Sequence, residues 1–266
     1  MKYAFMSFST PDQSLEKMLE TARRYGYDGI EPRLDSDHQH GIETDTDTQA
    51  RVSIRAQCAA AGIEIACIAT SCCFADPEDK DSRSDLAHEC IDLAGDLGCQ
   101  RLRVFGGLIG VGSQRSQAID RVSDALRSLS QHAAERSVVL CMETHDDWTD
   151  PQLVATVIQK VDHPNIAVNW DAVHPVRLSG STFEKSYALL KPWIRHVHVH
   201  DALKKEPFQF MALGQGDFDH REVLRLLQAD GYDGYLSGEW MEWEPPDVHL
   251  PRELATLKSY AGAVDS

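Results

Sequence analysis

The sequence lacks the features expected of a membrane-spanning or secreted protein. No long apolar run occurs in its 266 residues. The N-terminus shows no signal-peptide pattern, because Lys2 is followed at once by a mixed strand pattern. We therefore expect a cytoplasmic protein that has no membrane partner.

Basic residues are also few. Lys and Arg number 26 against 42 Asp and Glu, which gives a formal net charge of −16 at pH 7. A surface this acidic repels the phosphate backbone of DNA or RNA. We therefore expect no nucleic-acid partner.

The seven cysteines are odd in number and form no Cys-x-x-Cys pair. Two of them, Cys67 and Cys141, fall within predicted strands. Buried free thiols in a reducing compartment explain this usage better than disulfides or a thiolate metal site.

Two further absences concern the organisation of the chain. No Gly-x-Gly-x-x-Gly motif follows the first predicted strand, which removes the usual dinucleotide-binding fingerprint. No linker or low-complexity tract interrupts the sequence, so we expect a single domain over residues 1–266. What is present is ordinary globular composition, with 42% hydrophobic and 26% charged residues.

Strand and helix patterns alternate eight times along the chain. The predicted strands are 3–8, 28–31, 63–69, 101–105, 138–143, 166–171, 194–200 and 235–239. The predicted helices are 14–25, 47–61, 82–97, 116–136, 150–161, 182–190 and 220–230, with a last one that starts near Pro251. This alternation predicts right-handed βαβ units, and eight such units fill the chain. We therefore predict an α/β fold, a (β/α)8 TIM barrel with a parallel eight-stranded barrel.

One predicted strand has an unusual composition. Residues 195–201 alternate imidazoles with β-branched residues, so that His196, His198 and His200 share one face while Val197 and Val199 share the other. Such a row of imidazoles suits a strand that delivers a ligand to a metal. A surface strand with solvated histidines is the alternative, and this stretch alone leaves both open.

The active site of such a barrel lies at the carboxyl ends of its strands. The polar residues there are Glu31, Arg103, Glu143, His145, Asp171, His174, His198, His200, Asp201 and Glu239. Three carboxylates on different strands and one imidazole would surround a single point. Such a donor set suits a divalent ion such as Mn²⁺, Mg²⁺, Co²⁺ or Zn²⁺.

Several short motifs at these positions are similar to those of a known family. They are Glu143-Thr144-His145-Asp146, Asn169-Trp170-Asp171-Ala172-Val173-His174-Pro175, His198-Val199-His200-Asp201-Ala202, Gly214-Gln215-Gly216-Asp217, and Gly231-Tyr232-Asp233-Gly234 leading to Gly238-Glu239. Together they resemble the xylose-isomerase-like TIM-barrel superfamily, and more narrowly its sugar isomerase/epimerase branch. The resemblance runs over nearly the full chain.

The resemblance implies the roles of several residues. It implies a metal held by Glu143, Asp171, His198 and Glu239, and a His174 that contacts substrate or completes the metal shell. Family members often carry Lys where this chain has His200, so Lys204 is an alternative source of a cation. The residues expected to contact substrate are His174, His145, His200, Arg103, Lys204, Glu31 and Trp148. Each of them also has an ordinary structural explanation, such as a salt bridge, a loop cap or core packing.

The leading hypothesis is a metal-dependent isomerase or epimerase that acts through an enediolate on a small sugar or keto-polyol. Glu143 and Glu239 would lie on opposite sides of the reacting carbon and move its proton. The same site would permit a dehydratase or lyase of a keto-sugar. An apurinic-site endonuclease is disfavoured by the acidic charge, and a binding protein without turnover is a third class. The sequence favours a non-phosphorylated substrate and leaves homo-oligomerisation open.

Overall fold

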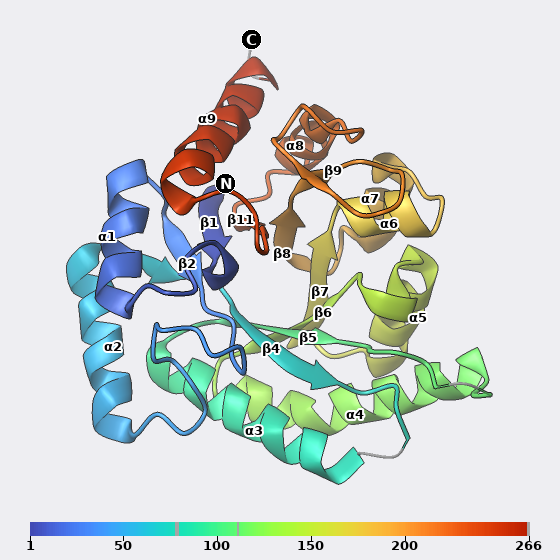
Figure 1. Ribbon diagram of the computed structural model, residues 1–266. Helices are drawn as coiled ribbons and strands as arrows, with labels where there is room; N and C mark the ends of the chain where they lie inside the picture. The colour runs from blue at the N-terminus through green and yellow to red at the C-terminus, as the bar shows by residue number, and fades with distance from the viewer. Residues whose placement is uncertain (78–79, 111, 265–266) are drawn as a thin grey trace.

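The computed structural model describes residues 1–77, 80–110 and 112–264 and shows a nearly closed barrel of parallel strands (Figure 1). The barrel strands are β1 (Lys2–Met6), β2 (Gly29–Glu31), β3 (Glu64–Ile65), β4 (Ile68–Cys73), β5 (Arg101–Phe105), β6 (Val139–Glu143), β7 (Ile166–Asp171), β8 (Ile194–Val199) and β11 (Tyr235–Gly238). They are hydrogen-bonded in the order β3-β2-β1-β11-β8-β7-β6-β5-β4. The predicted TIM-barrel fold is confirmed.

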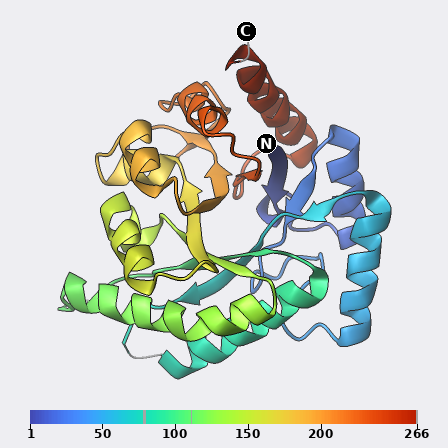
Figure 2. The ribbon, with the colours of Figure 1, turned by 180° about the vertical axis from the view of Figure 1, so that it is seen from behind.

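Helices surround the barrel, as the view from behind also shows (Figure 2). They are α1 (Leu15–Tyr25), α2 (Thr48–Ala61), α3 (Lys80–Leu97), α4 (Arg115–Glu135), α5 (Pro151–Val161), α6 (Val173–Leu178), α7 (Phe183–Leu190), α8 (His220–Ala229) and α9 (Pro246–Val264). Two 3₁₀ turns, η1 (Ser7–Ser9) and η2 (Asp146–Trp148), follow β1 and β6. Neighbouring helices contact one another around the ring, and α9 contacts both α8 and α1. None of the described helices is long and apolar enough to cross a membrane.

The third predicted strand is split where the barrel closes. The chain forms β3, breaks, and then forms β4, which extends over part of the predicted loop at 70–81. Backbone bonds cross this point: the Ala66 N–H donates to the Ile30 carbonyl, and the Ala69 N–H donates to the Pro32 carbonyl, both at 2.9 Å. The continuation of β2 therefore joins β4 through the bridge between Arg33 and Ala69 and closes the ring.

Local sequence signals explain where several helices begin and end. The Ser14 hydroxyl accepts from the Lys17 N–H, and Asp47 accepts from the Ala50 N–H, so both helix starts are capped. Gly62 ends α2 in the left-handed conformation at φ 68°, which glycine adopts without the penalty of a Cβ. Asp150 caps α5, as its position before a proline predicts.

Four further elements differ from the sequence prediction. Helix α6 was not predicted, and neither was the small antiparallel pair β9 (Asp201–Ala202) and β10 (Phe210–Met211). Helix α9 begins at Pro246, earlier than predicted, and contains Pro251 in its first turns. Pro246 fits the first helical position because the N–H it lacks has no partner there, whereas Pro251 lies beyond the first turn, where a proline removes one backbone bond of the helix.

The two faces of β8 separate an apolar layer from a polar interior. Val197 and Val199 belong to the apolar core cluster, whereas His196 and His198 both contact Glu31 across the barrel. The predicted alternation of this strand is therefore confirmed. Six of the seven cysteines are buried, at positions 58, 67, 72, 90, 99 and 141, and these six form no disulfide.

The end of β11 generates a prediction about stability. A Cβ built on Gly238 would lie 2.0 Å from the Cη2 and Cζ3 atoms of Trp240, an indole that is itself buried. Gly238→Ala should therefore lower the free energy of unfolding by about 1–3 kcal/mol, the usual cost of overpacking. Gly262→Ala is the control, because a Cβ there meets no atom within 4 Å. Urea unfolding that ranks the control as the weaker variant would contradict this packing.

Candidate functional site

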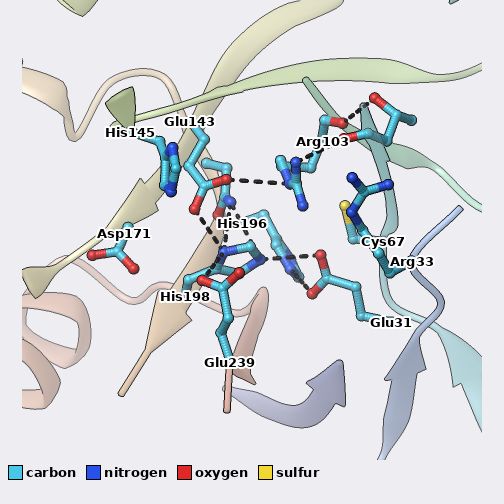
Figure 3. A network of polar contacts seen from close by, with 12 residues as sticks. Glu31, Arg33, Cys67, Arg103, Glu143, His145, Asp171, His196, His198 and Glu239 are labelled. Carbon is cyan, nitrogen blue, oxygen red and sulfur yellow. Dashed lines mark hydrogen bonds and ion pairs between the residues drawn. The ribbon is translucent and has the colours of Figure 1, made fainter. Parts of the chain in front are cut away.

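Four side chains converge at the carboxyl ends of neighbouring strands (Figure 3). Glu143 ends β6, Asp171 ends β7, His198 lies on β8, and Glu239 directly follows β11. The strand register places Asp171 opposite His198, and Ser237 of β11 opposite His198. One ligand atom from each of the four residues lies within 4.8 Å of those from the other three. The fold thus brings together the four residues predicted as metal ligands, and all four are buried.

His198 is the centre of this cluster. Its Nδ1 lies 2.9 Å from Glu143 Oε1 and 3.3 Å from Glu239 Oε2. Its Nε2 lies 3.0 Å from Glu31 Oε1. Burial disfavours the charged imidazole, but the neighbouring carboxylates outweigh burial and raise the pKa of His198 well above its usual value. A proton on His198 supplies positive charge to these carboxylates.

Glu31, at the end of β2, contacts the ring nitrogen of His198 that Glu143 and Glu239 do not face. It contacts His198 with one oxygen and His196 Nε2 with the other, at 2.8 Å. Burial raises its pKa, but His196 and His198 lower it well below the usual value, so that Glu31 is ionised. A carboxylate in this position can hold the Nε2–H of His198 and thereby leave Nδ1 as the ligand atom.

Asp171 is oriented by the helix that follows it. Its Oδ1 accepts from the backbone N–H groups of Val173 and His174, at 2.9 and 2.8 Å, and so caps the start of α6. Burial raises the pKa of Asp171, but the nearby His174 and His200 outweigh it and lower this pKa. The remaining oxygen, Oδ2, points at His200 Nδ1 from 3.4 Å.

Arg103 neutralises the cluster from the side of β5. Its Nε lies 3.2 Å from Glu143 Oε2, and both side chains are about 1% exposed. The Arg103 Nη1 donates to the Thr70 carbonyl at 2.8 Å, and the guanidinium lies 3.9 Å from the centre of the Phe105 ring. These contacts hold Arg103 against Glu143. They agree with a role in neutralising the buried carboxylate, which is the structural alternative to the predicted substrate contact.

The donor set fits a divalent cation. Asp171 Oδ2 is buried and accepts no hydrogen bond from any described residue. Glu143 Oε1, the oxygen that does not face Arg103, lies 2.9 Å from His198 Nδ1. Buried carboxylate oxygens require a compensating charge. Three carboxylates and one imidazole supply the oxygen and nitrogen ligands that Mn²⁺, Mg²⁺, Co²⁺ or Zn²⁺ takes in proteins.

A pocket of about 310 Å³ opens above this cluster. It is lined by His145, Asp146, His174, Arg177, Leu178, His200, Phe208, Phe210, Glu239 and Met241. The rings of His145 and His174 lie 4.8 Å apart, and those of His174 and His200 lie 5.4 Å apart. Burial opposes charge on His145, but its contact with Asp146 and the field of Glu143 raise its pKa to about 9. Three of the predicted substrate contacts, His145, His174 and His200, therefore line one pocket.

The other predicted substrate contacts lie elsewhere. Trp148 is fully buried, and its indole N–H donates to the Gly107 carbonyl at 2.8 Å, which is a packing role. Lys204 is exposed, with its Nζ 5.5 Å from the centre of the Phe218 ring, and it does not line the pocket. Glu31 is buried against His198 and is not among the residues that line the pocket.

Sequence reasoning missed several side chains of the pocket wall, among them Arg177, Phe208 and Phe210. Arg177 comes three residues after His174 on α6, while Phe208 and Phe210 come from the β9–β10 hairpin. The three-residue spacing of His174 and Arg177 places both on one side of α6, a signal that becomes visible only once a helix is assigned there.

Asp201 has a structural role that its place in a motif did not reveal. Its Oδ2 accepts from the Gly214 N–H at 2.9 Å and from the Gly216 N–H at 3.0 Å. A Cβ on Gly216 would lie 2.2 Å from Asp201 Oδ1, so the close approach requires glycine. The motif at 214–217 thus anchors the chain that follows the hairpin.

Comparison with known proteins gives a family match over most of the chain. A family model described as "Xylose isomerase-like TIM barrel" matches residues 19–260. A Bacillus anthracis protein named 3-dehydroshikimate dehydratase is 25% identical over 175 residues, which cover 59% of this chain and 61% of that protein. A Mus musculus protein named "Putative hydroxypyruvate isomerase" is 26% identical over 176 residues, which cover 62% and 60%. The chain therefore spans about three fifths of the length of these curated relatives.

Solved structures share the fold at low sequence identity. An L-ribulose 3-epimerase superposes with a TM-score of 0.82 at 17% identity, covering 99% of this chain and 95% of its own. A xylose isomerase-like TIM-barrel protein from Mycobacterium smegmatis, in complex with magnesium, gives 0.76 at 20% identity, covering 99% and 97%. These likenesses establish the fold alone.

The geometry predicts which variant loses metal. His198→Ala should weaken binding of Mn²⁺ by about 10-fold to 100-fold or more, because it removes a ligand and the link to Glu31. His163→Ala is the control, since His163 lies in the turn before β7. Calorimetric titration measures the affinity, and circular dichroism should show both variants folded. Unchanged affinity in His198→Ala would remove this residue from the metal shell.

Proposed function

The chain belongs to the xylose isomerase-like TIM-barrel family, and we propose that it is a divalent-metal-dependent isomerase or epimerase of a small carbohydrate. One observation carries the proposal: Glu143 and Glu239 both face His198 Nδ1, below a pocket open to a small molecule. Proteins similar to this chain carry the names putative hydroxypyruvate isomerase, 3-dehydroshikimate dehydratase and L-ribulose 3-epimerase, which supports this class of reaction. We further propose one domain over residues 1–266.

The proposed metal ligands are Glu143, Asp171, His198 and Glu239. When bound, a divalent ion would polarise the substrate carbonyl and offset the negative charge that develops there as a neighbouring proton leaves. Glu31 would keep the His198 ring oriented through Nε2. Arg103 would hold one oxygen of Glu143 and so fix the direction of the other.

The two glutamates are proposed to move the proton. Burial raises the pKa of Glu239, but His198 and Arg103 outweigh burial and lower it, so Glu239 is ionised at neutral pH and can accept a proton. A carboxylate within reach of the carbon next to the carbonyl removes its proton and leaves an enediolate. Return of a proton to the opposite face gives the epimer. Return to the neighbouring carbon exchanges an aldose for a ketose.

The pocket histidines would orient the substrate. His145 lies 2.9 Å from Asp146, a partner that favours its charged form and raises its pKa, and its ring can donate to a substrate oxygen. His200 is buried, which lowers its pKa and keeps the ring neutral. Two donors of different charge on one wall can distinguish neighbouring oxygens of a polyol.

The place of His145 in the pocket wall, where it pairs with Asp146 at 2.9 Å, also supports a second candidate, a dehydratase of a keto-sugar. If a hydroxyl group lies β to the carbon that loses its proton, a charged imidazole beside it can protonate the departing oxygen as water. The 3-dehydroshikimate dehydratase among the relatives is consistent with this outcome. An apurinic-site endonuclease is disfavoured, because the net charge of −16 opposes DNA binding.

The proposal predicts the behaviour of Glu143→Gln and Glu239→Gln. Glutamine keeps an oxygen ligand but cannot accept a proton from carbon. At saturating Mn²⁺ each variant should lose activity by about 10²-fold or more, the scale of a missing general base. Glu135→Gln on α4 is the control, since its side chain is exposed and accepts a hydrogen bond from Gln131 Nε2.

The measurement is deuterium incorporation next to the carbonyl of a panel of ketoses and keto-sugars in D₂O. An epimerase that uses one glutamate on each face should leave one variant able to exchange the substrate proton without forming the epimer. A dehydratase should instead form the unsaturated product in the wild type. Full activity of either Gln variant at saturating metal would contradict a mechanism that uses both carboxylates.

A further inference from the structure

Arg177 is a buried cation in the wall of the pocket that the proposed mechanism does not use. It lies on α6, one turn beyond His174, and its side chain is 8% exposed. Together with His145, His174 and Glu239 it lines the 310 Å³ pocket. Arginine is seldom buried in proteins. In a chain of net charge −16, many surface carboxylates could pair with Arg177, yet its side chain lies in the pocket wall.

The guanidinium is held from one side and only partly satisfied. Its Cζ lies 4.8 Å from the centre of the Phe208 ring, and its Nη2 donates to the carboxylate of Glu206. Its Nε is buried and has no hydrogen-bond partner among the described residues. Phe208 also contacts His200, with ring centres 6.0 Å apart, so the same aromatic side chain packs against both residues.

Glu206 is poorly placed to be a permanent partner. Its side chain is 74% exposed, on the hairpin segment between β9 and β10. A solvent-exposed carboxylate contributes little to the stability of an ion pair. Its carboxylate, however, shows that the guanidinium can bind a carboxylate at this position.

We propose that Arg177 binds a carboxylate of the substrate, so that this enzyme acts on an acidic sugar or hydroxy-keto acid. The inference rests on the proposed function, because it concerns the substrate of the same pocket. The carboxylate of Glu206 stands in for that of the substrate, and the substrate displaces it. The unpartnered Nε and an adjacent Nη form the planar fork that a carboxylate fills with two hydrogen bonds.

The charges around Arg177 favour a carboxylate over a phosphate. Arg177 is the sole Lys or Arg among the residues that line the pocket, and Glu239 lines it too. His145, a basic group of the same wall whose pKa is raised, is paired with Asp146 at 2.9 Å. A phosphate carries up to two negative charges and is bound by clusters of cations, which this wall does not supply. A monoanion matched to one guanidinium fits the charges that are present.

The test compares matched pairs of ligands by calorimetric titration of the Mn²⁺-loaded protein. D-fructuronate and D-fructose share a keto group and differ in whether the last carbon is a carboxylate. Hydroxypyruvate and dihydroxyacetone differ in the same way at shorter length. The proteins are the wild type, Arg177→Met, Arg177→Lys and Glu206→Gln, with Arg225→Gln on α8 as the exposed control.

At least one acid should bind the wild type more tightly than its neutral partner. Arg177→Met keeps the packing on Phe208 and should weaken binding of that acid by about 10-fold to 100-fold, while binding of the neutral ketose stays unchanged. Arg177→Lys should recover part of the loss, and Glu206→Gln should strengthen binding of the acid. Arg225→Gln should match the wild type.

Three outcomes overturn the inference: neither acid binds, each acid binds no better than its neutral partner, or Arg177→Met weakens both members of a pair equally. Deuterium exchange measured on the same samples separates this inference from the proposed function. If only the neutral ketoses exchange their proton, the inference that Arg177 binds a substrate carboxylate is overturned, and the isomerase proposal stands. Arg177-dependent binding of an acid without exchange or reaction would uphold the carboxylate and contradict the isomerase proposal.

Discussion

The structure depends on the neutralisation of buried carboxylates inside a barrel. Glu31, Glu143, Asp171 and Glu239 are all buried, and each would be costly to ionise alone in such surroundings. His198 contacts three of the four and receives a raised pKa as a result. A divalent cation bound by the four proposed ligands would replace that proton as the compensating charge. The same electrostatic requirement thus accounts for the histidine-rich strand and for the proposed metal site.

The barrel provides the geometry for this chemistry. Parallel strands end at one face, so residues 143, 171, 198 and 239, far apart in the sequence, become neighbours. The helix after β7 then adds a second layer of control, because its first N–H groups fix one oxygen of Asp171. The same helix carries the side chains of His174 and Arg177 into the pocket wall. One short helix therefore orients a ligand and supplies two groups that would face the substrate.

Much of this arrangement could be predicted from the sequence, where periodicity and turn chemistry agree. The strands at 101–105 and 166–171 were predicted with the bounds that the structure shows. Helix α6 was missed because six residues that include Pro175 carry no helical periodicity. The break between β3 and β4 depends on hydrogen bonds to β2 that no local pattern encodes. Arg177 was missed because it lies on this unpredicted helix. Trp148 and Glu31 were predicted to contact substrate, but they are buried through contacts between distant segments that the local sequence does not show.

The central claim is that Glu143, Asp171, His198 and Glu239 hold one divalent metal ion. Anomalous X-ray diffraction from crystals grown with Mn²⁺ tests it directly. The account predicts one strong peak at about 2.0–2.3 Å from a carboxylate oxygen of each acidic residue and from a ring nitrogen of His198. The absence of a peak there, or a peak held only by the neighbouring group of Asp171, His174 and His200, would contradict it.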